Sequence, residues 1–304
     1  MIGKLESRET APQNGQKGSP FALPGWSILA LKGPDALAFA QSQLMNDLAR
    51  LGDGQWQWNG WLNPKGRVIA LCLALRRDAE TLWLLLPDLP ASELAASLQR
   101  YVFRSKLRLT VVDDWQLAGS FVDSPEPPDC LARAGADEAI TLHFGITGDG
   151  ENSQRRLHLL PQSVHAPPAA RETLSSWLAG DLRAGLPHLD AEQREQHTPQ
   201  MLALDRLRAY SVKKGCYPGQ EIVSRTHFLG KAKRRLSRLR LPPDVEVAAG
   251  DVVTDEEGRP LSTLIDVADT SDGIEALAVL DDDSTVLFNG RAAERLPLLD
   301  YLPC

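Results

Sequence analysis

The chain has 304 residues, of which 43% are hydrophobic and 24% charged, and its formal net charge is −7. These proportions are typical of a soluble globular protein, and the length favours two or three domains. No apolar run reaches the roughly 18 residues of a membrane span, and residues 1–20 lack the apolar core of a secretory signal, so we expect no membrane segment and a disordered tail at residues 1–20.

The sequence from residue 21 to residue 114 alternates between strand and helix patterns. Residues 26–31 read as a short strand, and Gly33-Pro34-Asp35 then opens a helix whose apolar positions recur every three or four residues as far as Leu51. Further strands are expected at residues 55–62, 67–75, 81–86 and 106–112, with a helix at 92–103. This order predicts an α+β layer with helices on one face of a sheet.

The rest of the chain divides into two further expected domains. Residues 115–235 contain short strand-like runs, a helix at 169–179 that carries Trp177, and a helical pattern at 201–209, which together predict a second α+β unit. Residues 236–304 contain short strands separated by frequent Gly and Asp turns, which predicts a small β-barrel or sandwich.

The four cysteines, Cys72, Cys130, Cys216 and Cys304, stand far apart, and no CxxC pair occurs. This spacing argues against a disulfide-rich scaffold and against a metal or cluster site. We therefore expect a cytoplasmic protein that holds no metal of its own.

The most distinctive stretch begins at Lys213 and surrounds Cys216. Gly215, Gly219 and a proline between them predict a loop, and a helix is expected to follow from Pro218. A thiol becomes reactive when nearby cations or the amides of a helix N-terminus stabilise its thiolate. Lys214 and the expected helix start could do both. The alternative, a buried thiol in a tight turn, is common for free cysteine.

A concentrated positive charge surrounds this loop. Residues 205–240 contain eleven Lys and Arg against two acids, a local charge of +9, which leaves −16 for the remainder of the net −7. Such a stretch can attract a polyanion such as folate polyglutamate or tRNA. Basic stretches are more often only a solvated face of the protein.

The motif Lys214-Gly215-Cys216-Tyr217, followed by Gly219-Gln220-Glu221, resembles the signature of the YgfZ family. Members of that family are similar to the T-protein, the aminomethyltransferase of the glycine cleavage system. The similarity spans residues 24–240 and also includes Asn46-Asp47, Pro64-Lys65-Gly66-Arg67 and Ala184-Gly185-Leu186-Pro187. It implies a three-domain ring of ferredoxin-like α+β units and a C-terminal β-barrel, with folate in a central hole. It also implies support of iron–sulphur enzymes, including enzymes that modify tRNA.

The resemblance further implies which residues form the site. Trp26 and Trp177 match tryptophans that accompany folate binding in the family, and an indole offers a pterin a large face and an N–H donor. The functional pair is expected to be Cys216 and Lys214. The other expected contacts to tetrahydrofolate or a derivative are Asn46, Asp47, Gln220, Glu221 and Arg225, of which the last two are spaced to pair on one helix face.

One departure from the T-protein pattern bears on activity. T-proteins carry an acidic residue in the strand where this chain has Ile69 and Ala70, so the resemblance does not extend to aminomethyl transfer. Three functions remain open: a folate-binding accessory protein for iron–sulphur client enzymes, a tetrahydrofolate-dependent one-carbon or thiol transferase that uses Cys216 as nucleophile, and an RNA-binding module that contacts tRNA through residues 205–240.

Overall fold

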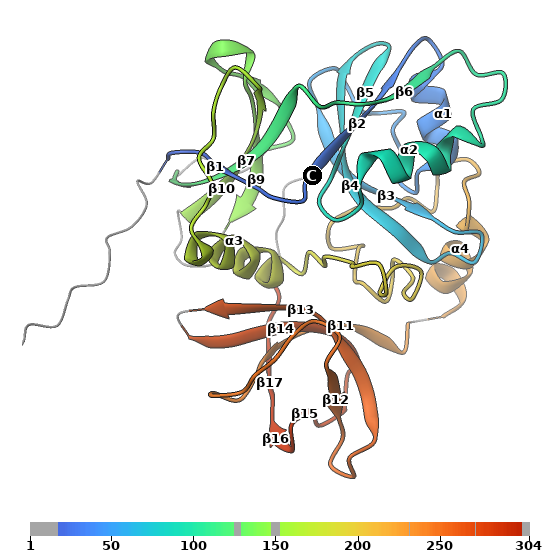
Figure 1. The fold of residues 1–304 in the computed structure, drawn as a ribbon. Coiled ribbons are helices and arrows are strands. Elements are labelled where there is room, and N and C mark those ends of the chain that lie inside the picture. The colour runs from blue at the N-terminus through green and yellow to red at the C-terminus, as the bar shows by residue number, and fades with distance from the viewer. Residues whose placement is uncertain (1–17, 125–128, 147–152, 231, 271, 300–304) are drawn as a thin grey trace, which may run out of the picture.

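The computed structural model describes residues 18–124, 129–146, 153–230, 232–270 and 272–299 (Figure 1). The expected disordered tail lies almost wholly outside these residues. Within them, three antiparallel sheets and four α-helices form an α+β structure, as the sequence predicts. No helix in the described part of the chain is long and apolar enough to cross a membrane.

The first sheet has the order β3-β4-β5-β2-β6, and helices α1 and α2 cover one of its faces (Figure 1). The order β4-β5-β2-β6 with its two helices is ferredoxin-like, and β3 adds an edge strand. The elements are β2 (Ser27–Lys32), α1 (Ala36–Gln43), β3 (Trp56–Leu62), β4 (Val68–Asp78), β5 (Thr81–Leu86), α2 (Ala91–Gln99) and β6 (Arg108–Val111).

Helix α1 is shorter than the apolar periodicity predicts. It ends at Gln43, and Leu44 is already extended and forms an isolated bridge with Trp61 of β3. The side chains of Leu44, Leu48 and Leu51 are nevertheless buried. The apolar spacing therefore reflects burial against the sheet rather than continued helix, and the prediction of a helix to Leu51 is wrong.

The second sheet has the order β1-β7-β10-β9-β8. Its first strand precedes the whole first sheet in sequence, so the chain crosses between the two sheets twice. Helix α3 (Arg171–Ala184) follows this sheet, contacts β13 and β14 of the third sheet, and ends at Gly185 with a φ of 67° (Figure 1). The strands are β1 (Phe21–Ala22), β7 (Trp115–Asp123), β8 (Arg133–Ala134), β9 (Ile140–Ile146) and β10 (Ser153–Pro161), with a 3-10 turn η1 (Ala136–Glu138).

Helix α4 (Gln220–Leu229) leads into the third sheet, which curls into a small barrel with its own core (Figure 1). The helix predicted at residues 201–209 is wrong: turns occupy this segment, and Ala203 and Arg208 have positive φ. The domain boundaries after residues 114 and 235 stay predictions. The strands of the barrel are β11 (Arg234–Arg240), β12 (Val252–Thr254), β13 (Pro260–Thr270), β14 (Gly273–Asp281), β15 (Leu287–Phe288), β16 (Arg291–Ala292) and β17 (Glu294–Leu296).

Candidate functional site at Cys216 and the junction of the three sheets

Two motifs that are 150 residues apart in sequence meet beside the first sheet. The turn between β3 and β4 contains Gly66, and Gly219 precedes α4; both have positive φ, 69° and 79°. A Cβ atom at Gly219 would lie 2.6 Å from the carbonyl oxygen of Asn63, and one at Gly66 would lie 2.9 Å from Cβ of Ile222. Only glycine allows this approach, so the loop that precedes α4 docks directly on the β3–β4 turn.

Lys214 fastens the same loop to the end of α1. Its buried ammonium donates to three main-chain carbonyl oxygens, those of Gln41 (2.6 Å), Leu44 (2.6 Å) and Asn46 (3.0 Å). Carbonyls at a helix C-terminus lack partners within the helix, which explains why a cation is favourable here. An ammonium has three donors, and all three are directed to the main chain rather than to Cys216. Burial lowers the pKa of Lys214 to about 8, and the charge of Asp47 opposes that shift.

Cys216 is exposed to solvent, and its thiol is free. The following residue, Tyr217, is buried, and its hydroxyl donates to the carbonyl oxygen of Ser211 (3.2 Å). The side-chain amide of Gln220 donates to the carbonyl oxygen of Lys214 (3.0 Å). The loop is therefore held on both sides of Cys216 while the thiol faces solvent, which excludes the alternative of a buried thiol in a tight turn.

The other cysteines differ from Cys216. Cys72 is buried in the first sheet, and burial raises the pKa of its thiol to about 12. Cys130 is disulfide-bonded. Cys304 lies outside the described residues. In the described part of the chain, no group of three or more His, Cys, Asp or Glu side chains could hold a metal ion.

Asn46 and Asp47 lie beside Lys214, where they bond to the protein itself. The side-chain amide of Asn46 donates to the carbonyl oxygens of Trp58 (2.8 Å) and Arg208 (2.7 Å). Asp47 accepts hydrogen bonds from the main-chain N–H of Ala49 (3.0 Å) and the side chain of Gln41, and these bonds lower the pKa of its carboxyl group. Their role as folate contacts stays a prediction.

Glu221 and Arg225 are both exposed on α4. No ion pair between them is found among the described residues, although their spacing allows one. Both side chains are thus available to a ligand or partner, and both lie on the helix that follows Cys216. Their assignment to folate also stays a prediction.

Trp26 and Trp177 meet through a third ring, Phe144 of β9. Phe144 stacks on Trp177 with a centroid distance of 5.2 Å and an interplanar angle of 13°, and it packs edge-on against Trp26 at 5.9 Å. Trp177 is only 4% exposed, whereas Trp26 is half-buried. The structure therefore gathers both predicted tryptophans in one aromatic cluster, in which Phe144 covers a face of Trp177.

A buried arginine borders this aromatic cluster. The guanidinium of Arg155 lies 4.9 Å from the ring centroids of both Phe144 and Trp177. One of its nitrogens, Nη1, donates to Asp181 (2.6 Å) and to the carbonyl oxygen of Trp177 (2.9 Å). Within the described residues, Nε and Nη2 of Arg155 and the indole nitrogen of Trp177 are buried and have no acceptor. Buried donors usually have partners, so a ligand with acceptor atoms would satisfy these groups.

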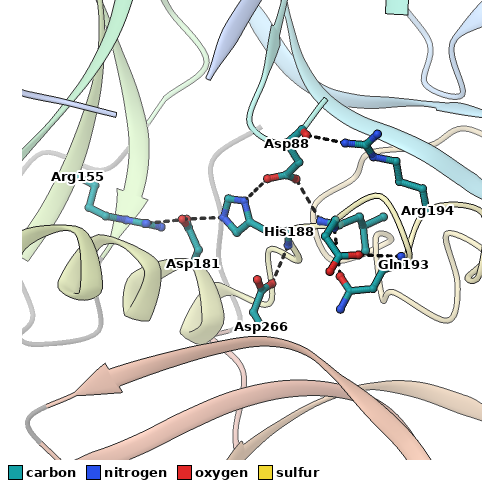
Figure 2. A network of polar contacts seen from close by, with 9 residues as sticks. Asp88, Arg155, Asp181, His188, Gln193, Arg194 and Asp266 are labelled. Atoms are coloured by element: carbon teal, nitrogen blue, oxygen red, sulfur yellow. Dashed lines mark hydrogen bonds and ion pairs between the residues drawn. The ribbon is translucent and has the colours of Figure 1, made fainter. Parts of the chain in front are cut away.

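A polar network that sequence patterns do not reveal joins all three sheets (Figure 2). At its centre, the imidazole of His188 contacts Asp88 through Nδ1 (2.6 Å) and Asp181 through Nε2 (3.2 Å). The main-chain N–H of His188 donates to Asp266 of β13 (2.7 Å), and Arg155 of β10 pairs with Asp181. Asp88 follows β5, so one histidine connects the two α+β units with the barrel.

Two longer side chains extend the network. Gln193 is buried and donates to the carbonyl oxygens of Leu264 and Ile265 in the barrel (3.1 Å each). Arg194 donates to the carbonyl oxygen of Asp88 (2.8 Å) in the first unit (Figure 2). The segment between α3 and Cys216 is thus fixed to both neighbours. The family resemblance singles out the segment Ala184-Gly185-Leu186-Pro187, which directly precedes His188.

The carboxylates control the ionisation of His188. Burial alone would lower the pKa of His188, but the charge of Asp88 and the hydrogen bonds to Asp181 and Asp88 raise it well above the ordinary value. The imidazolium can then donate from both nitrogens. Burial raises the pKa of Asp266 to about 7. Because both pKa values are raised, His188 and Asp266 bind protons more tightly in the folded protein than in the unfolded chain.

These shifts predict that the junction loses stability as the pH rises. The contribution of His188 is fully present below about pH 6.5 and is lost as the pH rises through its higher folded pKa. The raised pKa of Asp266 also makes the folded protein less stable as the pH rises. We expect the difference in unfolding free energy between the wild type and His188→Gln to shrink as the pH rises above about 6.5, measured by urea denaturation. A difference that is constant with pH would contradict this, and the exposed His165→Gln is the control.

Most of the cationic side chains of residues 205–240 are buried or form ion pairs or hydrogen bonds within the protein. Four arginines of β11 form ion pairs: Arg234 with Asp281, Arg235 with Asp205, Arg238 with Glu275 and Arg240 with Glu294. Lys214 is buried, and Arg206 donates to the carbonyl oxygen of Ala184. The exposed cations that this stretch retains in the described part of the chain are Arg208, Lys213, Arg225 and Lys233.

Comparison with known proteins bears out the resemblance. No protein-family model matches the sequence. The chain is 27% identical over 289 residues to the tRNA-modifying protein YgfZ of Cronobacter sakazakii, with 86% of this chain and 84% of the relative covered. It is 28% identical to the YgfZ proteins of Klebsiella pneumoniae, with 76% of each covered, and of Serratia proteamaculans, with 91% and 90% covered. This chain resembles the YgfZ proteins.

The fold of this YgfZ-like chain also has a solved counterpart. It is similar to the glycine cleavage system aminomethyltransferase T of Bartonella henselae, with a TM-score of 0.70 and 93% of this chain and 86% of that chain covered. Because the two sequences are only 18% identical, this likeness shows the fold alone. The predicted T-protein-like α+β fold is confirmed.

Proposed function

We propose that this YgfZ-like chain is a folate-binding accessory protein that supports iron–sulphur enzymes, including enzymes that modify tRNA. The observation that carries the proposal is the exposed free thiol of Cys216, on a loop that Lys214 and the Gly66–Gly219 contact hold in place. A cysteine that served only packing would be buried. Similarity to several proteins named tRNA-modifying protein YgfZ supports the connection with tRNA modification.

The surroundings of Cys216 define what the thiol can do. An exposed thiol can enter thiol–disulfide exchange, or bind a metal as one thiolate ligand. Iron–sulphur clusters are held by about four such ligands, so a single cysteine fits a transient role towards a cluster on a client enzyme. The same exposure is compatible with the second candidate, a folate-dependent one-carbon or thiol transferase.

The aromatic cluster fits a folate. A pterin has a flat face that can stack on an indole, and ring acceptors that can bond to N–H donors. Trp26 and Trp177 supply the faces, and Arg155 and the indole of Trp177 supply buried donors that lack acceptors among the described residues. Because Phe144 covers a face of Trp177, a pterin that stacks there must displace this ring. Folate would supply one-carbon chemistry, and these residues would bind and orient it.

Folate binding can be measured on matched tryptophan variants. Trp26→Ala should weaken the binding of a reduced folate by about 1–3 kcal/mol, because a stacked ring is lost. Trp177→Phe should weaken it while keeping the packing of the cluster, because only the N–H donor and part of the ring disappear. Calorimetric titration measures both, and Trp83→Phe, on the first sheet, is the control. Unchanged affinity in both variants would remove the two tryptophans from the site.

Complementation tests the function itself. In bacterial cells that lack their own YgfZ, this chain should restore the modified nucleosides made by iron–sulphur enzymes, as measured by mass spectrometry of digested tRNA. A soluble, folate-bound chain that restores none of them would contradict the proposal. Product formed from tetrahydrofolate by the purified chain would instead favour the transferase.

A further inference from the structure

A second basic surface lies on the first sheet, far in sequence from residues 205–240. The segment from residue 100 to residue 108 reads RYVFRSKLR and contains four cations and no acid. All four side chains are exposed, and none forms an ion pair with a described residue. The protein as a whole carries a charge of −7, so this concentration of one sign runs against the overall charge. The four cations are Arg100, Arg104, Lys106 and Arg108.

An aromatic side chain stands out among these cations. Phe103 is 88% exposed, and its φ of 39° lies in the left-handed region that non-glycine residues rarely adopt. A phenyl ring in this position gains little from burial, and the backbone conformation is strained. Tyr101 is 40% exposed, and its ring is held edge-on against Trp61 with centroids 6.5 Å apart. The positive φ of Phe103 serves the turn between α2 and β6, but the exposure of its ring contributes nothing to packing among the described residues.

The segment is nevertheless well fixed. Val102 is buried, and the main-chain N–H of Ser105 donates to its carbonyl oxygen (2.8 Å). Asp35 accepts a hydrogen bond from the main-chain N–H of Lys106 (2.6 Å). A Cβ at Gly33 would lie 2.4 Å from the carbonyl oxygen of Lys106, so the two segments are in tight contact. The cations and rings are thus presented by an ordered backbone.

Two further cations, Arg108 and Lys32, lie on the other face of the sheet, because their neighbours Leu31, Leu107 and Leu109 pack in the core shared with α1 and α2. Strand β6 is an edge strand, and its Arg108 is the register partner of Lys32 in β2. Both side chains are exposed, and like charges directly opposite each other destabilise a strand pair. Cationic side chains commonly protect an exposed edge from pairing with other strands, which accounts for Arg108 on β6 but not for Arg100, Arg104 and Lys106, which precede the strand. The single sign of these three side chains favours an anionic partner.

We propose that the segment that exposes Arg100, Phe103, Arg104 and Lys106 binds single-stranded RNA. Cations that track phosphates and rings on which bases stack are the two features of single-strand binding sites, and both are present. A membrane-binding segment would present several exposed apolar side chains, whereas Phe103 is the one large hydrophobic side chain of residues 100–108 that is more than half exposed. The inference deepens the proposed function by assigning the RNA contact, and rests on it only for the choice of RNA among polyanions.

The surface is connected to the Cys216 loop. Tyr101 contacts Trp61, Trp61 forms a bridge with Leu44, and the carbonyl oxygen of Leu44 accepts a hydrogen bond from Lys214. Tyr101 is therefore linked to the Cys216 loop through Trp61, Leu44 and Lys214. An RNA held at residues 100–106 would be presented together with Cys216 to a client enzyme.

The test is the binding of a fluorescein-labelled, unmodified anticodon stem-loop and of oligouridine, measured by anisotropy on the folate-free protein between about 50 and 200 mM salt. Phe103→Ala should weaken binding by about 5- to 100-fold, because a stacked base is lost. The double variant Arg104→Ala/Lys106→Ala should reduce the slope of log affinity against log salt by about 1.4, at 0.7 for each phosphate contact. Because no folate or client is present, failure here leaves the test of the proposed function intact.

Phe103→Gly separates binding from structure. Glycine relieves the left-handed strain, so the melting temperature should stay the same or rise, while RNA affinity falls as in Phe103→Ala. The comparison variants are Phe228→Ala, whose ring is 68% exposed on α4, and Lys213→Ala/Lys233→Ala. Full RNA affinity in Phe103→Gly, or a loss confined to the comparison variants, would overturn the proposal. So would binding to phosphatidylserine vesicles, but not to RNA, that depends on Phe103.

Discussion

Asp181→Ala should lower the free energy of unfolding by about 3–5 kcal/mol, because it removes one partner from a buried ion pair. The side chains of Asp181 and Arg155 are both 0% exposed, and they lie 2.6 Å apart. Without the carboxylate, the guanidinium stays buried beside two aromatic rings with only a carbonyl oxygen as acceptor. His188 would lose its second carboxylate at the same time. Chemical denaturation monitored by circular dichroism measures the effect.

Two further variants keep that result interpretable. Asp181→Asn retains the shape and one acceptor, so its loss should be smaller than that of Asp181→Ala. Glu294→Ala removes the exposed ion pair with Arg240 and should cost at most about 1 kcal/mol. If Asp181→Ala were as mild as Glu294→Ala, the junction would not depend on this charge, and the central place that the structure gives the network would be wrong.

Lys214→Met and Cys216→Ala should have opposite profiles, although the two residues are neighbours. Methionine matches the length of lysine but leaves three carbonyl oxygens without their donor, so we expect a loss of about 2–4 kcal/mol in the free energy of unfolding. Cys216→Ala removes an exposed thiol and should change that free energy by at most about 0.5 kcal/mol. Lys213→Met, at an exposed position, is the matched control for the charge. Equal stability of Lys214→Met and the wild type would contradict the role of Lys214 in holding the loop.

Much of the site was visible in the sequence because the chemistry is local. Glycines and a proline around Cys216 predict a loop, and Pro218 with Gln220 predicts the helix that follows. Helix α4 does begin at Gln220. The α+β class follows equally from the order of strand and helix patterns, since each pattern is set by residues close together in the chain.

The role of Lys214 in holding the loop could not be predicted from the sequence. A lysine two residues before a cysteine suggests a partner for the thiolate, but its acceptors are the carbonyls of residues 41–46, which are 170 positions away. These carbonyl oxygens have no partners within a helix because α1 ends at Gln43, earlier than the apolar periodicity predicts. A long-range contact that depends on where a helix ends has no signature in local spacing.

The junction network escaped prediction for a related reason. Asp88, Asp181, His188 and Asp266 come from a strand end, a helix, a turn and a barrel strand, and no spacing between them is characteristic. The basic segment 205–240 shows the opposite case, a feature that is plain in the sequence but changes its meaning in the structure. Its charge was evident, but most of its cations are paired or buried once the barrel forms. Net charge along the sequence does not tell which cations remain available.

The central claim is that the exposed thiol of Cys216 is needed for function while the fold does not need it. The most direct measurement is the level of modified nucleosides in tRNA from cells in which Cys216→Ala replaces their own YgfZ. We expect cells with the variant to be as deficient as cells with no YgfZ, although the variant accumulates and melts like the wild type. Full restoration of the modified nucleosides by Cys216→Ala would contradict the account.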